Sequence, residues 1–146
     1  MKKWSILFFC LMALCLTTTV RAGDGKPIPM NQLPATAQQF VRQHFSIDQL
    51  ALVKMESELF SKSYEVVFSN GDHIEFDSKG NWEKIDCHSS VVPAELVPAP
   101  IAKDVRKHYP MASIRELEKG RKEYEVKLSN RRELTFDTNF NLTDID

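Results

Sequence analysis

The chain has 146 residues, of which 42% are hydrophobic and 10% aromatic, and its 19 basic and 20 acidic residues give a formal net charge of −1 at pH 7. This apolar content supports a packed core and excludes a chain that is disordered throughout. The sequence has no sustained run of Lys and Arg. It therefore predicts no nucleic-acid partner, because phosphate neutralisation requires clustered positive charge.

The first 22 residues have the three parts of a secretory signal peptide. Lys2 and Lys3 supply the positive start, an apolar run extends from Ile6 to Leu16, and Val20-Arg21-Ala22 offers a cleavage site. We predict cleavage near Ala22 and export to the periplasm or the medium. Loss of residues 1–22 removes three basic residues and leaves residues 23–146, with a net charge of −4. That remainder has no apolar run near the roughly 20 residues needed to span a membrane.

Two of the three cysteines, Cys10 and Cys15, lie within the apolar part of the predicted signal. Lipid attachment at Cys15 is an alternative, but Leu14 stands where a lipoprotein peptidase takes Gly, Ala or Ser. Cys87 then remains alone, so no disulfide within the chain is expected. The sequence favours Cys87 as a small apolar residue at the end of a strand. An odd cysteine in an exported protein can also pair between chains, which would make a dimer through Cys87.

Residues 29–86 match residues 93–146, with residues 87–92 as a linker and one length change around residues 59–62. Such ordered matches indicate an internal repeat. The matching segments include Val41-Arg42-Gln43-His44-Phe45 with Val105-Arg106-Lys107-His108-Tyr109, Tyr64-Glu65-Val66 with Tyr124-Glu125-Val126, and Phe76-Asp77 with Phe136-Asp137.

Each copy begins with helical spacing and continues with alternating strands. Helices are predicted to begin at Pro34 and Pro98 and to end near Phe45 and Tyr109, each preceded by a short helical turn. Four strands are expected in each copy, starting with 50–57 and 113–119. Asn70-Gly71 is typical of a two-residue hairpin turn. The second copy has no glycine at the two equivalent turns, so its asparagines are expected to adopt the left-handed conformation there.

These patterns predict an α+β fold, specifically a tandem repeat of two helix-plus-four-stranded antiparallel sheet units with the helices packed on one sheet face. A unit of about 55 to 60 residues is close to the lower size limit for independent folding. A sheet or core shared between the copies is therefore expected within one domain, residues 23–146.

The motifs resemble those of the exported PepSY-like family, also called β-lactamase-inhibitor-like and common in Gram-negative bacteria. The resemblance rests on a helix that opens with Leu-Pro-Ala, its Arg-x-His-Phe/Tyr end, and the strand motifs Tyr-Glu-Val, Ser-Asn-Gly, Glu-Phe-Asp and Gly-Asn-Trp. It covers nearly all of residues 23–146 and implies an antiparallel sheet with helices on one face. It carries no catalytic or binding residue onto this chain. In the inhibitor that gives the family its second name, the sheet face grips a partner protein.

Residues of the types that bind metals or perform catalysis do not form a site pattern. His44 and His108 occupy equivalent helix positions without a second ligand at metal-binding spacing. Asp77 and Asp137 recur because a turn recurs, and Asp77-x-Lys79-x-Asn81 has too few oxygen ligands for a calcium loop. No hydrolase, zinc-protease or phosphate-loop motif is present in the sequence. We therefore predict no enzyme, no metal and no cofactor.

One face of the predicted sheet offers a binding surface. If alternate strand residues pack under the helices, the opposite face carries Trp82, Val67, Glu65, His73, Glu75, Lys127 and Glu133. We expect this face and the hairpin loops to bind a protein or peptide, with Trp82 as the apolar anchor. In the competing interpretation, Trp82 covers the edge of its own core and the face is only solvated. A second hypothesis is a small-molecule or ion binding protein that works through the cleft between the copies.

Overall fold

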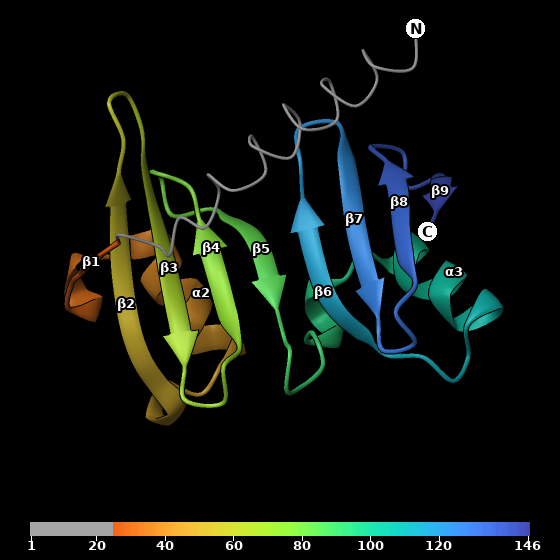
Figure 1. The fold of residues 1–146 in the computed structure, drawn as a ribbon, viewed down its shortest axis with the longest axis horizontal. Helices are drawn as coiled ribbons and strands as arrows, with labels where there is room; N and C mark the ends of the chain where they lie inside the picture. Colours follow the sequence, from red (N-terminus) through yellow and green to blue (C-terminus); the bar gives the residue numbers. More distant parts are fainter. Residues whose placement is uncertain (1–24) are drawn as a thin grey trace, which may run out of the picture.

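The computed structural model describes residues 25–146 (Figure 1). The predicted signal peptide, its cleavage near Ala22 and the lipidation alternative at Cys15 lie outside the described residues. Within them, nine antiparallel strands form one sheet in the order of the sequence. The strands are β1 (Lys26–Pro27), β2 (Leu50–Ser57), β3 (Lys62–Phe68), β4 (His73–Phe76), β5 (Trp82–Asp86), β6 (Ile114–Lys119), β7 (Glu123–Leu128), β8 (Glu133–Asp137) and β9 (Leu142–Ile145).

The predicted organisation into a tandem repeat of two helix-plus-four-stranded units is wrong. All nine strands belong to a single sheet, which carries two α-helices in the described part of the chain. Two separate units would each leave an edge of unpaired backbone groups at their boundary. Instead β5 pairs directly with β6, with Ile85 opposite Leu117, and β1 adds a strand beside β2. The division into residues 29–86 and 93–146 stays a prediction from the sequence matches.

The two helices are α2 (Ala35–His44) and α3 (Ala99–His108), and three short 3₁₀ turns, η1 (Met30–Gln32), η2 (Ile47–Gln49) and η3 (Ala94–Leu96), connect the strands and helices. Pro34 and Pro98 occupy the N-cap positions, so each helix begins one residue after the proline at which the sequence predicted its start. Each helix turns its small and branched residues toward the sheet. In α3 these are Ile101 and Val105, both buried. None of the helices in residues 25–146 is long and apolar enough to cross a membrane.

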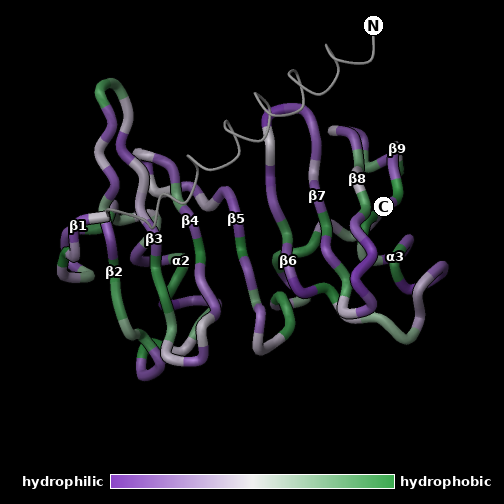
Figure 2. Tube along the Cα trace, in the orientation of Figure 1, coloured by the Kyte–Doolittle hydropathy of each residue, from purple (hydrophilic) through white to green (hydrophobic). Residues whose placement is uncertain are grey.

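The core lies between the helices and one face of the sheet. A continuous row of paired apolar residues crosses the sheet on this side, formed by Val53, Val66, Ile74, Ile85, Leu117, Val126 and Leu134. All of them are buried. Both helices lie behind the sheet in the view of Figure 1, so the nearer face is covered by neither of them. Along the strands, Figure 2 shows hydrophobic and hydrophilic residues alternating, which matches one buried and one open face.

The hairpin turns of the two halves reach the left-handed conformation with different residues. Gly71 and Gly80 have φ of 91° and 86°, whereas Arg131 and Phe140 have φ of 68° and 63°. The expectation that asparagines take these positions in the second half is therefore wrong. The asparagines contribute side-chain hydrogen bonds instead: the Asn130 Oδ1 atom accepts from the backbone N–H of Arg132 at 3.2 Å.

Candidate functional site

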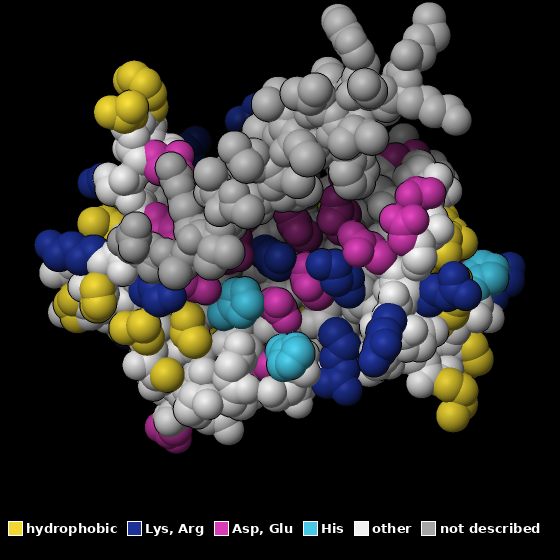
Figure 3. All heavy atoms as spheres, in the orientation of Figure 1, with side chains coloured by type: hydrophobic (Ala, Val, Ile, Leu, Met, Phe, Trp, Pro, Cys, Tyr) yellow, Lys and Arg dark blue, Asp and Glu magenta, His cyan; other side chains and the backbone are white. Residues whose placement is uncertain are grey.

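The strand register places mostly polar side chains in two rows across the sheet face that neither helix covers, which we call the open face. The first row consists of Leu52, Val67, His73, Asp86, Glu116, Lys127 and Glu133. The second row consists of Lys54, Glu65, Glu75, Lys84, Glu118, Glu125, Thr135 and Asp144. Figure 3 views this side and shows acidic, basic and histidine side chains gathered over the central strands.

The open face is acidic. Its two rows contain eight carboxylates and three lysines, a formal charge of −5 with His73 neutral. The predicted net charge of residues 23–146 is −4. This one face therefore accounts for the whole negative balance of the predicted mature chain, and the remaining surface is close to neutral.

Glu116 is the most buried carboxylate of the open face. Its Oε1 atom lies 3.0 Å from Nζ of Lys84 and 3.1 Å from Nζ of Lys127. Burial acts to raise the pKa of Glu116, but the hydrogen bonds and charges of the two lysines outweigh it and hold the pKa below its ordinary value. Burial likewise acts to lower the pKa of Lys84, and its interactions with Glu116 leave that pKa raised. This cluster holds the centre of the face together across β5, β6 and β7.

In the second row, the negative charges of Glu75 and Glu125 are less well compensated than that of Glu116. Burial raises the pKa of Glu75, and the charges of Lys84 and His73 offset this only in part. Burial also raises the pKa of Glu125, and the neighbouring charges of Glu118, Glu133 and Glu123 add to the effect. A raised carboxyl pKa means that the ionised form lacks stabilising partners. This row therefore carries negative charge that its neighbours do not fully compensate and that a positive group could neutralise.

Six of the seven predicted site residues lie together on the open face: Val67, Glu65, His73, Glu75, Lys127 and Glu133. His73 lies within 4.0 Å of Glu75 and 3.8 Å of Asp86, between Nε2 and a carboxylate oxygen in each case. Lys54 pairs with Glu65 at 3.1 Å. The structure thus brings most of the predicted residues into one connected polar surface.

Trp82 does not lie on the open face. Its ring stacks on Phe40 of α2 with centroids 6.4 Å apart, and Nζ of Lys119 lies 5.8 Å from the ring centroid. The reason is a β-bulge: Glu75 pairs with Lys84, but the next residue, Phe76, pairs with Trp82. Glu83 is the extra residue, and it reverses the alternation that placed Trp82 with Lys84 and Asp86. Trp82 covers its own core, as the competing interpretation expected.

Sequence reasoning missed Lys84, Glu116 and Glu118 as members of the face. Lys84 and Glu116 are 32 positions apart in the sequence and meet only because β5 pairs with β6. A second bulge, between Ile114 and Glu116 on β6, also breaks the simple alternation of that strand. Only a prediction that paired β5 with β6 would have placed Lys84, Glu116 and Glu118 on the open face.

The other candidate residues also have partners within the fold. Nδ1 of His44 lies 3.2 Å from Oε1 of Glu95, and Nδ1 of His108 lies 3.2 Å from Oδ1 of Asp104. Asp77 accepts hydrogen bonds from the backbone N–H groups of Lys79 and Asn81, and Asp137 accepts the same pattern in its own turn. Among residues 25–146, no group of three or more His, Cys, Asp or Glu side chains is arranged to hold a metal ion.

Cys87 follows β5 and is buried in the core, with 1% of its surface exposed. Burial raises the pKa of its thiol, which disfavours the reactive thiolate. An interchain disulfide would require this side chain to leave the core. The structure therefore agrees with a small apolar role for Cys87 and gives no support to a dimer formed through it.

Several solved structures share this fold and much of the sequence. One, described as a "putative calcium-regulated periplasmic protein" of Bacteroides thetaiotaomicron, is 56% identical over 86% of this chain and 98% of its own, with a TM-score of 0.82. A "putative periplasmic protein" of Bacteroides vulgatus is 50% identical over 86% and 98% of the two chains, with a TM-score of 0.81. Another from the same species is 34% identical over 81% and 94%, with a TM-score of 0.76. No curated protein matches the chain.

A family model also matches residues 62–144, which span β3 to β9 and therefore most of the sheet. The family is described as beta-lactamase-inhibitor-like and PepSY-like, in agreement with the resemblance seen in the helix and turn motifs. This chain belongs to the PepSY-like, beta-lactamase-inhibitor-like family.

Proposed function

We propose that this chain is an exported, non-enzymatic binding module that meets a protein or peptide through its open face and hairpin loops. The observation that carries the proposal is the open face itself: neither helix covers it, and its charged rows are held in register by the sheet. The description of similar structures as periplasmic proteins supports export of this chain as well. The inhibitor-like description of the family supports a protein partner.

The charge of the open face favours a partner that presents Lys and Arg. Glu75 and Glu125 have raised pKa values because their ionised forms are undercompensated. A cationic group placed over them would neutralise charge that the chain itself leaves unbalanced. Complementary charge of this kind accelerates association and selects against anionic partners.

The proposal is tested by affinity capture from periplasmic extract with the wild type and a double variant, Glu118→Lys/Glu125→Lys. Both positions lie on the open face, so we expect the variant to lose the proteins that the wild type retains. Asp48→Lys/Asp104→Lys is the matched control, because these residues lie in η2 and α3 and the charge change is the same. A wild type that retains no protein, or a double variant that retains the same proteins as the control, contradicts the proposal.

A small-molecule function is the second candidate, favoured by one hollow beside α3. The hollow has a volume of about 420 Å³, and its lining includes Val91, Val97, Ala102, Val105 and Ile114 with Arg106 as its charged residue. An apolar wall with one guanidinium suits an apolar ligand that carries an anionic group. Titration with a fluorescent fatty acid tests this, and Ala102→Trp, which fills the hollow, should abolish the signal. Equal signals from the two proteins would contradict it.

Ion binding has less support. One similar structure is described as calcium-regulated, whereas residues 25–146 of this chain contain no group of three or more His, Cys, Asp or Glu side chains arranged to hold a metal ion.

A further inference from the structure

The hairpin between β2 and β3 ends in two apolar residues with no packing partner in the core. Leu59 is 93% exposed and Phe60 is 99% exposed. The backbone N–H of Glu58 donates to the carbonyl oxygen of Ser61 at 2.9 Å, so Leu59 and Phe60 are the central residues of a closed loop. Figure 1 shows this hairpin extending beyond the other loops at its end of the sheet, and Figure 2 shows its hydrophobic tip.

The turn does not require apolar residues at these positions. The equivalent hairpin between β6 and β7 closes in the same way, with the N–H of Gly120 donating to the carbonyl of Glu123 at 2.8 Å. Its central residues are Arg121 and Lys122, both exposed. A charged pair therefore satisfies the same backbone geometry. The requirements of the turn therefore do not explain why the first hairpin carries an apolar pair at its tip.

We propose that Leu59 and Phe60 form an apolar anchor that docks on a protein segment whose apolar side chains are flanked by Lys or Arg. This inference rests on the proposed function and names the chemistry of its partner. Exposed aromatic and aliphatic side chains that protrude from a surface gain free energy mainly by burial in a partner.

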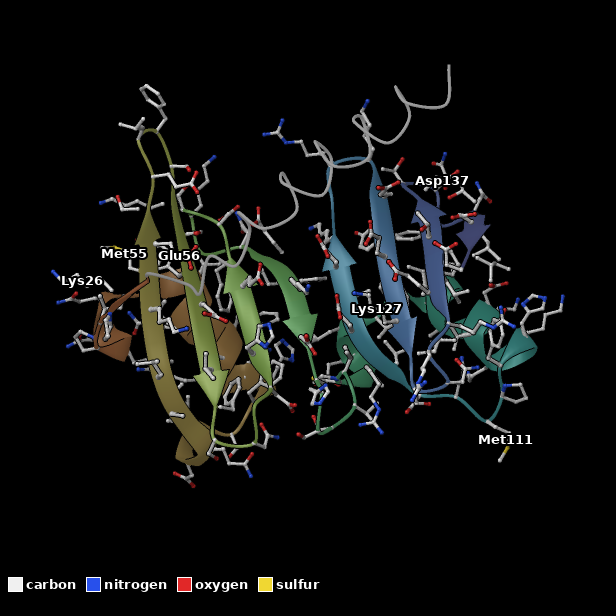
Figure 4. All side chains as sticks on the ribbon, in the orientation of Figure 1. Lys26, Met55, Glu56, Met111, Lys127 and Asp137 are labelled. Carbon is white, nitrogen blue, oxygen red and sulfur yellow. The ribbon has the colours of Figure 1, made fainter. Side chains whose placement is uncertain are left out.

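The charges below the tip identify the polar part of the partner. A hollow of about 370 Å³ at the base of the hairpin is lined by Glu56, Glu65, Glu75 and Glu83, with Lys54 as its basic residue. Lys54 is already engaged by Glu65 at 3.1 Å. An apolar contact at the tip and a positive side chain over the carboxylates can therefore be made by the same segment. Figure 4 shows Glu56 on β2 below the tip.

The same charges argue against a membrane as the occupant. Apolar residues that insert into bilayers are normally accompanied by Lys and Arg, which attract anionic lipid headgroups. Here β2 and β3 carry Lys54 and Lys62 as well as Glu56 and Glu65, and Glu58 directly precedes the tip, so acidic side chains outnumber basic ones around it. An acidic hairpin base is repelled by an anionic surface, so the tip fits a basic protein segment better.

The experiment uses a labelled synthetic peptide of Leu and Lys, patterned to form an amphipathic helix. Its binding to the full chain is measured by fluorescence anisotropy, beside a Leu and Glu peptide of equal length. The test variant is Leu59→Ser/Phe60→Ser, which changes no charge. The matched control is Met111→Ser, because Met111 is an equally exposed apolar residue, 96%, in the loop after α3 and points away from the body of the protein in Figure 4.

We expect the wild type to bind the Leu and Lys peptide and not the Leu and Glu peptide. The hairpin variant should bind at least about tenfold more weakly at an unchanged melting temperature, and Met111→Ser should bind within about twofold of wild type. The inference is overturned if the wild type does not bind the Leu and Lys peptide. It is also overturned if the hairpin variant binds this peptide as tightly as Met111→Ser does. Sedimentation with phosphatidylglycerol vesicles that requires Leu59 and Phe60 also overturns it.

The open-face variant Glu118→Lys/Glu125→Lys separates the two proposals. If it loses the peptide while the hairpin variant keeps it, the anchor is wrong and the proposed function stands. If the hairpin variant loses the peptide while the open-face variant keeps it, the anchor stands and Glu118 and Glu125 take no part in its contact. The proposed function is then decided by the capture experiment, in which the same open-face variant must lose the retained proteins.

Discussion

The Nζ atom of Lys84 lies 3.0 Å from Oε1 of Glu116, across the pairing of β5 with β6. This ion pair spans the boundary at which two four-stranded units would otherwise have ended. Lys127 approaches the same oxygen from β7 at 3.1 Å. The cluster therefore links the two halves of the sheet and orders the centre of the open face.

Replacement of Lys84 by Met should lower the free energy of unfolding by about 1–3 kcal/mol at pH 7, because Glu116 stays mostly buried with one fewer partner. The folded pKa of Glu116 lies below the ordinary value of 4.5, so its stabilising contribution is present above pH 4.5 and is lost as the pH falls through the folded pKa. Urea unfolding at pH 7 and at acidic pH measures both effects.

Lys54→Met is the matched control for Lys84. Lys54 pairs with Glu65 on the same face, but the side chain of Glu65 is 24% exposed, against 11% for Glu116. We expect a loss of less than about 1 kcal/mol for this more solvated pair. Equal losses for the two lysines would mean that the position of Lys84 at the β5–β6 pairing has no special effect on stability.

Glu125→Gln should stabilise the protein at pH 7. The folded pKa of Glu125 is raised by burial and by the charges of Glu118, Glu133 and Glu123, so its ionised form is a net cost to the fold. A group with a raised folded pKa contributes stability below its unfolded pKa and loses it as the pH rises through the folded pKa. The gain should be below about 1 kcal/mol at pH 7 and vanish in acid, as pH-dependent thermal unfolding would show. A variant less stable than wild type at pH 7 contradicts this.

Gly80→Ala should destabilise the protein more than Gly71→Ala. Both glycines have positive φ, which costs an alanine about 1–2 kcal/mol. A Cβ at Gly80 would also lie 2.7 Å from Cβ of Pro34 and 2.9 Å from the backbone N of Ala37, whereas a Cβ at Gly71 meets no atom within 4 Å. The turn after β4 thus packs against the start of α2. Urea unfolding of the two variants gives the comparison, and similar losses would argue against that contact.

Local features of this fold were readable from the sequence, and long-range ones were not. The helices between Pro34 and Phe45 and between Pro98 and Tyr109, and strand 50–57, were predicted correctly, because proline positions and apolar spacing are local signals. The pairing of β5 with β6 depends on residues far apart in sequence. The fold class was therefore wrong, although the small size of each half indicated a shared sheet.

The predicted binding face was wrong at one residue, Trp82, for a related reason. Alternation along β5 assigns Trp82 to the face of Lys84, and one inserted residue, Glu83, reverses that assignment. Nothing in the local sequence distinguishes a bulged strand from a regular one here. The same limit applies to Arg131 and Phe140, whose left-handed conformation is imposed by the hairpin rather than preferred by those side chains.

Trp82→Ala should therefore affect stability and not partner binding. Loss of a half-buried indole that stacks on Phe40 and packs on the core should cost about 2–3 kcal/mol in the free energy of unfolding. Capture of periplasmic proteins at a temperature where the variant is fully folded should match that of wild type. Loss of binding by a folded Trp82→Ala protein would place the indole in the partner interface after all.

Asp72→Asn tests how the linker between the halves is held. Asp72 is buried at 5% exposure and its carboxylate accepts from the backbone N–H of Ser89 at 2.9 Å, from Nδ2 of Asn70 at 3.0 Å and from the hydroxyl of Ser90. An amide NH₂ in place of one oxygen cannot accept the last two bonds, which should cost about 1–3 kcal/mol.

The Asp72 variant should also expose the linker to proteases before the sheet unfolds, because Asp72 joins residues 89 and 90 to the turn between β3 and β4. Limited proteolysis at neutral pH, with cleavage sites identified by mass spectrometry, measures this. Asp144→Asn, an exposed change of the same kind on β9, serves as the control and should leave both stability and cleavage unchanged. Cleavage between residues 87 and 92 that is equally fast in both variants would show that Asp72 does not hold the linker.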